Sequence, residues 1–230
     1  LCFFSKSYKK AALILLSRYK KKLFSKFFLR LFTKIFCQFE YVVNRFERLN
    51  KNQDIHQTKM MFNLIKKCQI KYDQNVNIDV DFPVEKIFFS GKKLITVHLS
   101  HKWINSFYSE DDFLELINLL NIKGFTVVLT TDESTQNKFI KIYDKYKIVP
   151  NCDFKSFKSI NNNILILDNL DYNLWIKVIY SSSTIITPEC GCSHIAAAYK
   201  IPVNIIYGPK NHPEAIHKEY APWKSKYNKF

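Results

Sequence analysis

Glycine, proline and long apolar runs are scarce in this chain of 230 residues. Only 4 glycines and 7 prolines interrupt a composition that is 47% hydrophobic. This balance excludes a disordered or collagen-like chain, because those chains are poor in apolar residues or rich in glycine and proline. We therefore expect a globular protein with a sizeable core, organised in one or two domains.

The sequence also lacks a membrane span, since no apolar stretch approaches the roughly 20 residues that such a helix needs. The run Ala11–Leu16 lies between Lys10 and Arg18 and is shorter than the apolar region of a signal peptide. We therefore expect a cytoplasmic protein, either soluble or peripheral on the inner face of the cell membrane.

The 6 cysteines are too few and too scattered for a disulfide scaffold, which is typical of much smaller secreted domains. Only Cys190 and Cys192 are close together in the sequence. A reducing compartment is the simplest interpretation.

Acidic residues are nearly absent from the first 50 positions, which hold 12 of the 35 Lys and Arg residues but only two of the 20 Asp and Glu. Arg18, Lys22, Lys26, Arg30 and Lys34 recur every four residues, and phenylalanine, leucine and isoleucine fill other faces. This spacing predicts an amphipathic basic helix or helix pair. Because its like charges repel, an external anion such as a phospholipid, a phosphorylated lipid or a nucleic acid is one interpretation.

The other interpretation of this basic region is an ordinary surface helix, with a solvated basic face and an apolar stripe packed into the core. The phenylalanines have core-like spacing, which argues against the stacking of bases on them. No nucleic-acid partner is therefore expected.

From Lys93 onward, short β-rich runs alternate with helical patterns. The expected strands are 94–99, 125–131, 163–168, 184–187 and 203–207. Between them, Ser109 with Asp112 forms a capping-box signature, and apolar residues three and four apart mark further helices. This alternation predicts an α/β fold with a parallel sheet and helices on both faces. Ligands of such sheets bind beyond the carboxyl ends of the strands.

The sequence before Lys93 shows a less regular pattern. Met61, Leu64, Ile65 and Cys68 have helical spacing, and a polar stretch that ends at Pro83 follows them. We expect a boundary near 72–92, with a partial, basic and helical domain over 1–85 and a Rossmann-like domain over 86–230.

The segment ITPECGCSHIAAA (186–198) leaves an expected strand and becomes an alanine-rich helix. Gly191 is expected to relieve the steric limit on the turn and to let a ligand approach the backbone. Free amides at the helix start, with the positive end of the helix dipole, favour a phosphate or diphosphate. His194, in the first turn, is a further candidate donor to this anion.

Other interpretations of these residues remain. Cys190, Cys192 and His194 could bind zinc with His212 or His217, but C-x-C spacing at a helix start disfavours both a zinc site and a thiol redox pair. The ordinary alternatives are apolar packing for the cysteines and a backbone hydrogen bond for the histidine.

The same segment resembles the C-terminal domain of the heptosyltransferases, glycosyltransferase family nine. That family has an acidic residue after a strand, then Thr or Ser, Gly, two variable residues and His, followed by an alanine-rich helix and a later Gly-Pro. The matching residues here are Glu189, Cys190, Gly191, His194, Gly208 and Pro209.

A second stretch carries the resemblance upstream. VHLSHKWINSFYSEDDFLELI (97–117) is similar to the opening of the same domain, where a lysine near a tryptophan contacts the donor phosphates. Lys102 beside Trp103 is the matching lysine; without the resemblance it would be one more surface lysine, as His98 and His101 would be surface histidines.

The resemblance implies a GT-B fold, with a nucleotide-sugar-binding domain preceded by part of an acceptor domain. It also implies inverting transfer of a sugar, in this family a heptose, from an ADP-heptose-like donor to an anionic, lipid-linked acceptor of the lipopolysaccharide type. The partners would be this donor, this acceptor and the cytosolic membrane surface, without a cofactor or an essential metal. The alternative function is a non-catalytic, basic nucleotide- or phospholipid-binding protein derived from such a domain.

The resemblance further implies a set of donor-binding residues: Ser100, Lys102, Glu133, Glu189, Cys190, Gly191, Cys192 and His194. Lys102 and Ser100 would contact one phosphate, while Gly191, the Cys192 amide and His194 would hold the other. Glu189 would repel phosphate and is assigned to sugar or ribose hydroxyls, and Glu133 is assigned to the ribose.

The chain departs from the family pattern in two respects. The family usually has Asp at position 189 and Thr or Ser at position 190, and a thiol is a poorer hydrogen-bond donor than a hydroxyl. The family's general base, a carboxylate near the start of the N-terminal domain, has no counterpart here, so no catalytic residue is assigned. The chain, which begins with Leu1 rather than Met, is expected to be a fragment or a processed form that cannot catalyse transfer alone.

Overall fold

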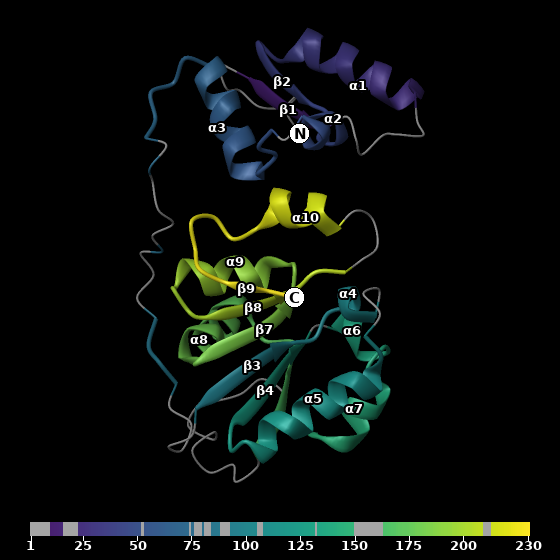
Figure 1. Ribbon diagram of the computed structural model, residues 1–230, viewed down its shortest axis with the longest axis vertical. Helices are drawn as coiled ribbons and strands as arrows, with labels where there is room; N and C mark the ends of the chain where they lie inside the picture. Colours follow the sequence, from purple (N-terminus) through teal and green to yellow (C-terminus); the bar gives the residue numbers. More distant parts are fainter. Residues whose placement is uncertain are drawn as a thin grey trace. The chain divides into compact units, whose positions relative to one another are not determined.

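The computed structural model describes residues 10–15, 23–51, 53–73, 75, 80, 84–87, 93–104, 108–131, 133–149, 163–208 and 213–230. Several expectations fall outside these residues: Arg18 and Lys22 of the basic helix, most of the boundary 72–92, Pro209 and His212. The chain forms two compact units, of which the first contains Leu1–Val76 and Glu214–Ala221 and the second contains Asn77–Pro213 and Pro222–Phe230 (Figure 1).

The first unit holds a small sheet of two parallel strands and the helices around it. Its elements are β1 (Ala11–Leu15), α1 (Leu23–Phe36), β2 (Phe39–Val43), α2 (Arg45–Asn50), α3 (Gln57–Lys67) and most of α10 (Pro213–Tyr220). The register of the strands runs from Ala11 opposite Phe39 to Leu15 opposite Val43. The short apolar run Ala11–Leu16 is therefore mostly a strand, which explains its length.

Helix α3 contacts both strands of this sheet and buries Met60 and Leu64. His56 caps the helix, because its Nδ1 accepts a hydrogen bond from the Thr58 amide at 3.2 Å. Its Nε2 lies 2.8 Å from the carbonyl oxygen of Ala221, so it donates there and ties the end of α10 to the start of α3. The expected helix around Met61 is thus present.

Helix α1 is the expected basic helix, but the alternative interpretation, in which its apolar stripe packs into the core, is wrong. Phe24, Phe27 and Phe28 are 79%, 65% and 53% exposed. The reason is the rotation of the helix about its axis: Lys26, Leu29 and Thr33, on the other side, are the partly buried residues.

The second unit is built on a parallel sheet with the strand order β5-β6-β4-β3-β7-β8-β9. The strands are β3 (Leu94–His98), β4 (Thr126–Thr131), β5 (Lys147–Ile148), β6 (Ile164–Asp168), β7 (Thr184–Pro188), β8 (Val203–Ile206) and β9 (Asn228–Lys229). The helices are α4 (His101–Ile104), α5 (Glu110–Ile122), α6 (Glu133–Gln136), α7 (Ile140–Lys145), α8 (Tyr172–Ser181) and α9 (Gly191–Ala198). This architecture confirms the predicted α/β fold with a parallel sheet.

The chain enters this sheet at its centre and winds outward twice. From β3 it proceeds through β4 to β6 on one side, and it then returns to β7 on the other side of β3. The strand order therefore reverses between β3 and β7. In doubly wound sheets, this switch point is where ligands bind, beyond the carboxyl ends of the strands.

Alternate residues of the buried strands pack on opposite faces of the sheet. On β4, Val127 and Leu129 join a core with Phe113 of α5, whereas Val128 joins a core with Val178 of α8. Helices therefore cover both faces (Figure 1). The Ser109–Asp112 capping box at the start of α5 is present as predicted.

None of the described helices combines the length and the apolar character that crossing a bilayer requires.

Candidate functional site

The switch point brings together two segments that the sequence analysis had singled out. Strands β3 and β7 are hydrogen-bonded neighbours, with Ile95 opposite Thr184 and Val97 opposite Ile186. Ser100 and Lys102 follow β3, and the segment from Glu189 to Gly191 follows β7. Because β3 and β7 are parallel neighbours, their carboxyl ends point the same way, and the segments that follow them lie side by side.

Lys102 stands on the short helix α4, which is anchored by its neighbour Trp103. The indole of Trp103 is fully buried, its Nε1 donates to the carbonyl oxygen of His98 at 2.6 Å, and its ring meets the edge of Phe113 at 4.4 Å between centroids. The buried side chain of Trp103 therefore fixes the position of the short helix that carries the charge of Lys102.

The Lys102 ammonium group is paired with Glu189 across the switch point. Its Nζ lies 3.0 Å from Oε2 of Glu189 and also donates to the carbonyl oxygen of the same residue. The Lys102 side chain is still 42% exposed, so it is a surface lysine that has a fixed partner. Ser100, 8% exposed, accepts a hydrogen bond from the Lys102 amide at 3.4 Å, so its hydroxyl also lies at this edge.

Helix α9 begins without a conventional cap. Cys190 has the extended backbone of an N-cap residue, but in this described helix its side chain accepts no hydrogen bond of normal geometry. The Ser193 amide and hydroxyl both bond back to the Cys190 carbonyl, at 3.2 and 2.7 Å. The amides of Gly191 and Cys192 are the natural donors for an anion at this helix start.

The thiol of Cys190 also lies at the start of α9, and it is protonated and therefore neutral. Burial raises its pKa, although the Thr187 hydroxyl, the nearby amides of Cys192 and Ser193 and the charge of Lys102 act in the other direction. Its Sγ lies 3.2 Å from the hydroxyl oxygen of Thr187. Thr187 is fully buried, and the sequence analysis had not singled it out.

Gly191 has a different role in the turn from the expected one. The described residues with positive φ include Gly124 but not Gly191, so the turn itself does not require a glycine. A Cβ atom added to Gly191 would have no described heavy atom outside the local chain within 4 Å. What the glycine contributes is therefore open space beside the start of α9.

Cys192 and His194 lie farther along this helix. Cys192 is fully buried among Ile179, Ile185 and other apolar residues, and burial raises the pKa of its thiol well above the usual value. This is the apolar packing that was the ordinary interpretation. His194, the fourth residue of α9, is partly buried. Within the described ranges, no three His, Cys, Asp or Glu residues are grouped so that they could hold a metal ion.

The remaining candidates lie at the ends of neighbouring strands. Glu133 is the first residue of α6, shortly after β4, and its side chain lies outside the described part of the chain. His98, set aside in the sequence analysis, lies 3.0 Å from the hydroxyl of Thr130 through its Nδ1 and 5.5 Å from the Trp175 ring. His101 is exposed on α4.

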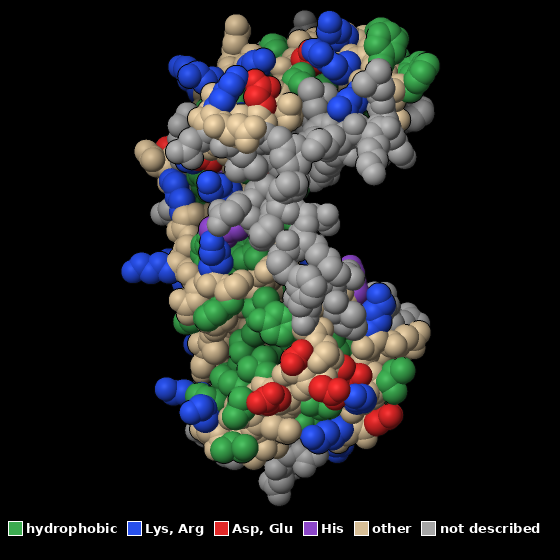
Figure 2. Space-filling model, turned by 45° about the vertical axis from the view of Figure 1, so that its right-hand side comes forward, with side chains coloured by type: hydrophobic (Ala, Val, Ile, Leu, Met, Phe, Trp, Pro, Cys, Tyr) green, Lys and Arg blue, Asp and Glu red, His purple; other side chains and the backbone are tan. Residues whose placement is uncertain are grey.

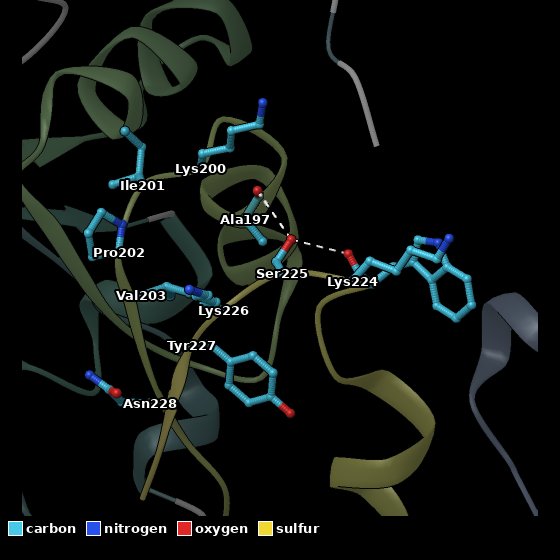
Figure 3. A pocket seen from close by; sticks show the side chains of 11 residues that line it. Ala197, Lys200, Ile201, Pro202, Val203, Lys224, Ser225, Lys226, Tyr227 and Asn228 are labelled. Atoms are coloured by element: carbon cyan, nitrogen blue, oxygen red, sulfur yellow. Dashed lines mark hydrogen bonds between the residues drawn. The ribbon is translucent and has the colours of Figure 1, made fainter. Parts of the chain in front are cut away.

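A cavity of about 580 Å³ lies at the other end of the strands of the same sheet (Figure 3). It is lined by Ala197, residues 200–203 and residues 223–228. These residues include the first residues of β8 and β9, so the cavity faces the amino ends of the strands. It contains none of the predicted donor-binding residues, but Lys200, Lys224 and Lys226 make it a rival site for an anion.

The sequence matches the family model described as glycosyltransferase family 9 (heptosyltransferase) over residues 17–230. A search of curated proteins found no significant match.

Several solved structures share the fold. The glycosyl transferase family 9 protein from Veillonella parvula DSM 2008 superposes with a TM-score of 0.62 at 10% identity, over 86% of this chain and 53% of that one. E. coli heptosyltransferase WaaC with ADP gives a TM-score of 0.55 at 13% identity, over 86% and 55%. The same enzyme with ADP-2-deoxy-2-fluoro heptose gives 0.53 at 14%, over 86% and 54%.

This chain thus spans about half the length of these solved structures. At such low identity, the superpositions show the fold alone, and it is the fold of GT-B glycosyltransferases. The family model, by contrast, covers nearly the whole sequence. The chain therefore belongs to glycosyltransferase family 9, the heptosyltransferase family.

Proposed function

We propose that this chain forms the donor-binding part of a glycosyltransferase that transfers a heptose, with inversion, from an ADP-heptose-like donor to a lipid-linked acceptor of the lipopolysaccharide type. The acceptor is anionic and is met at the cytosolic surface of the membrane. The single observation that carries the donor assignment is the contact of Lys102 with Glu189, two residues before the start of α9, at the switch point of the sheet.

The chemistry of the donor explains why these groups are needed. Breaking the bond between the sugar and the diphosphate leaves negative charge on the departing nucleotide. Fixed N–H donors and an ammonium group stabilise that charge without having to reorganise as it develops. In this proposal, Lys102 and Ser100 bind one phosphate, and the amides of Gly191 and Cys192 bind the other, with His194 as a further donor.

Glu189 has two roles in this proposal. Without a donor it holds the Lys102 ammonium group in place, at 3.0 Å. When a diphosphate enters, the phosphate competes for the ammonium group, and the carboxylate is then available to sugar or ribose hydroxyls. Glu133 follows β4, the other neighbour of β3, and is proposed to approach the ribose.

The test is a calorimetric titration of the chain with ADP, UDP and GDP. We expect one diphosphate, ADP, to bind, and Lys102→Ala to weaken its binding at least about ten-fold, as loss of a charged hydrogen bond does. The matched control is Lys141→Ala, which removes an exposed lysine of the same unit that is paired with Asp111 at 2.8 Å. Equal effects of the two substitutions, or no binding by the folded chain, would contradict the proposal and favour a non-catalytic relative.

A further inference from the structure

Helix α1 turns its most apolar face outward, and this face has no part in the donor site. Phe24, Phe27, Phe28, Leu31 and Ile35 are between 43% and 79% exposed. We call these five residues the phenylalanine face. Phe24, Phe28, Leu31 and Ile35 follow the spacing i, i+4, i+7, i+11, so they form one stripe along the helix.

The rings on this face form one continuous apolar surface. Phe24 and Phe28 stack with 6.3 Å between ring centroids, and Phe27 meets Phe28 edge-on at 6.0 Å. An exposed apolar surface of this kind marks an interaction site, since scattered single residues are what an ordinary surface shows. In Figure 2, hydrophobic side chains and basic side chains lie next to one another in the upper part of the view.

The attachment of the helix to its own unit uses the opposite side. The partly buried residues of α1 are Lys26, Leu29 and Thr33, spaced i, i+3, i+7. Thr33 reaches the Glu40 carboxylate of β2 at 3.4 Å. A helix that served only the core of its unit would be rotated by about half a turn from this orientation.

The charges on α1 identify the partner that fits the phenylalanine face. Arg30 and Lys34 are exposed and lie four residues apart between the attached side and the phenylalanine face, and the helix sequence LFSKFFLRLFTKIF contains no acidic residue. An apolar face with basic residues beside it is the pattern of a helix that lies in the interface of an anionic bilayer. With 14 residues, α1 is roughly 21 Å long, so it lies along a bilayer surface rather than across it.

We infer that α1 binds the surface of an anionic phospholipid bilayer, with the phenylalanine face inserted among the acyl chains and Arg30 and Lys34 at the headgroups. This inference rests on the proposed function for its biological setting, because it names the element that holds the enzyme at the membrane of its lipid-linked acceptor. In this inference, α1 is held at the membrane by insertion of the phenylalanine face and not by electrostatic attraction alone.

The experiment is co-sedimentation of the chain with vesicles of phosphatidylcholine alone or with roughly 30% phosphatidylglycerol. The triple variant Phe24→Gln, Phe28→Gln, Ile35→Gln removes apolar groups while retaining good helix formers. The matched control is Leu119→Gln, Ile122→Gln, Ile140→Gln, three side chains of the second unit that are 49%, 79% and 60% exposed.

We expect the chain to bind the anionic vesicles, the α1 variant to bind at least about ten-fold more weakly, and the control to bind like the unmodified chain. The double variant Arg30→Gln, Lys34→Gln should lose about five-fold in affinity for each charge removed, on anionic vesicles alone. No binding to either vesicle would overturn the inference, as would equal losses in the α1 variant and its control. A dimer in solution that the α1 variant abolishes, without vesicle binding, would identify a second copy as the occupant instead.

Titration of the same variants with ADP separates this inference from the proposed function. If vesicle binding fails while ADP still binds, only the membrane role of α1 is lost. If ADP binding fails in the unmodified chain while vesicle binding holds, the donor assignment is lost and the membrane role remains.

Discussion

The Nζ atom of Lys102 lies 3.0 Å from Oε2 of Glu189, although 87 residues separate the two positions in the sequence. The contact joins the two halves of a doubly wound sheet at the point where its strand order reverses. It also places a negative charge where the proposed function requires a diphosphate. Glu189 is therefore expected to limit the affinity for the bare nucleotide and to contribute to recognition of the sugar.

Glu189→Gln tests this expectation. Removal of the carboxylate charge should raise ADP affinity, because a like charge next to the phosphates is lost; at this partly exposed site, we expect about two- to ten-fold. The same variant should lose whatever preference the chain has for ADP-heptose over ADP. Glu115→Gln removes an exposed carboxylate of α5 and serves as the control in both titrations. Weaker binding of ADP by Glu189→Gln would mean that Glu189 positions Lys102 for the phosphate.

Gly191→Ala tests whether the glycine is needed for ligand binding or for stability of the fold. An added methyl group meets no described atom outside the local chain within 4 Å, and α9 gains a better helix former. Chemical denaturation should therefore show unchanged stability or a gain of up to about 1 kcal/mol. Titration with ADP should show at least about ten-fold weaker binding, because the methyl group occupies the approach to the helix start. If ADP affinity is unchanged in a stable variant, the phosphate does not bind at Gly191.

Cys190→Ser should give a more stable protein than Cys190→Ala. Cys190 already has the extended backbone of an N-cap residue but supplies no side-chain cap, and a serine oxygen can accept from an amide of the first turn. We expect about 0.5–1 kcal/mol more stability than for Cys190→Ala, measured by urea denaturation of both variants. Equal stability of Cys190→Ser and Cys190→Ala would show that the helix start has no need of a cap.

Ser109→Ala should destabilise the second unit without affecting nucleotide binding. The Ser109 side chain accepts from the Asp112 amide, and the Asp112 carboxylate accepts from the Ser109 amide and hydroxyl. Loss of this cap typically costs about 1 kcal/mol. Thermal melts should show a drop of about 2–4 °C. Ser183→Ala, at an exposed serine, should leave the melting temperature unchanged.

The effect of Ser109→Ala should also depend on pH. Hydrogen bonds from Ser109 hold the pKa of Asp112 below its ordinary value. A carboxyl group whose pKa is lowered by folding stabilises the protein above its unfolded pKa and loses that contribution as the pH falls through its folded pKa. The difference in melting temperature between the unmodified chain and Ser109→Ala should therefore be largest near neutral pH and should shrink in acid. A constant difference at all pH values would exclude this linkage.

Much of the second unit could be predicted from the sequence, because its signals are local. The short runs rich in valine and isoleucine became buried strands, such as β4, and the capping box at Ser109 marked the start of α5. The segment ITPECGCSHIAAA showed the end of β7 and the start of α9 for the same reason. These patterns depend on neighbouring residues, which the sequence displays directly.

The features that the sequence could not show depend on distant contacts. Periodicity identified α1 as amphipathic but could not tell which side of the helix would meet β2, so the exposure of Phe24 stayed undecided. Nothing local indicated that Glu214–Ala221 would group with the first unit, where Ala221 accepts a hydrogen bond from His56. The pairing of Lys102 with Glu189 likewise follows from strand order, which sequence spacing does not encode.

Binding of a nucleoside diphosphate at the switch point can be detected by amide hydrogen exchange with and without ADP. We expect ADP to slow exchange in two peptides together, 98–104 and 186–198, and Lys102→Ala to abolish both effects. Slower exchange only at 200–203 and 223–228, around the cavity at the amino ends of the strands, would contradict binding at the switch point and place the anion in that cavity instead. Unchanged exchange in every peptide at saturating ADP would contradict it as well.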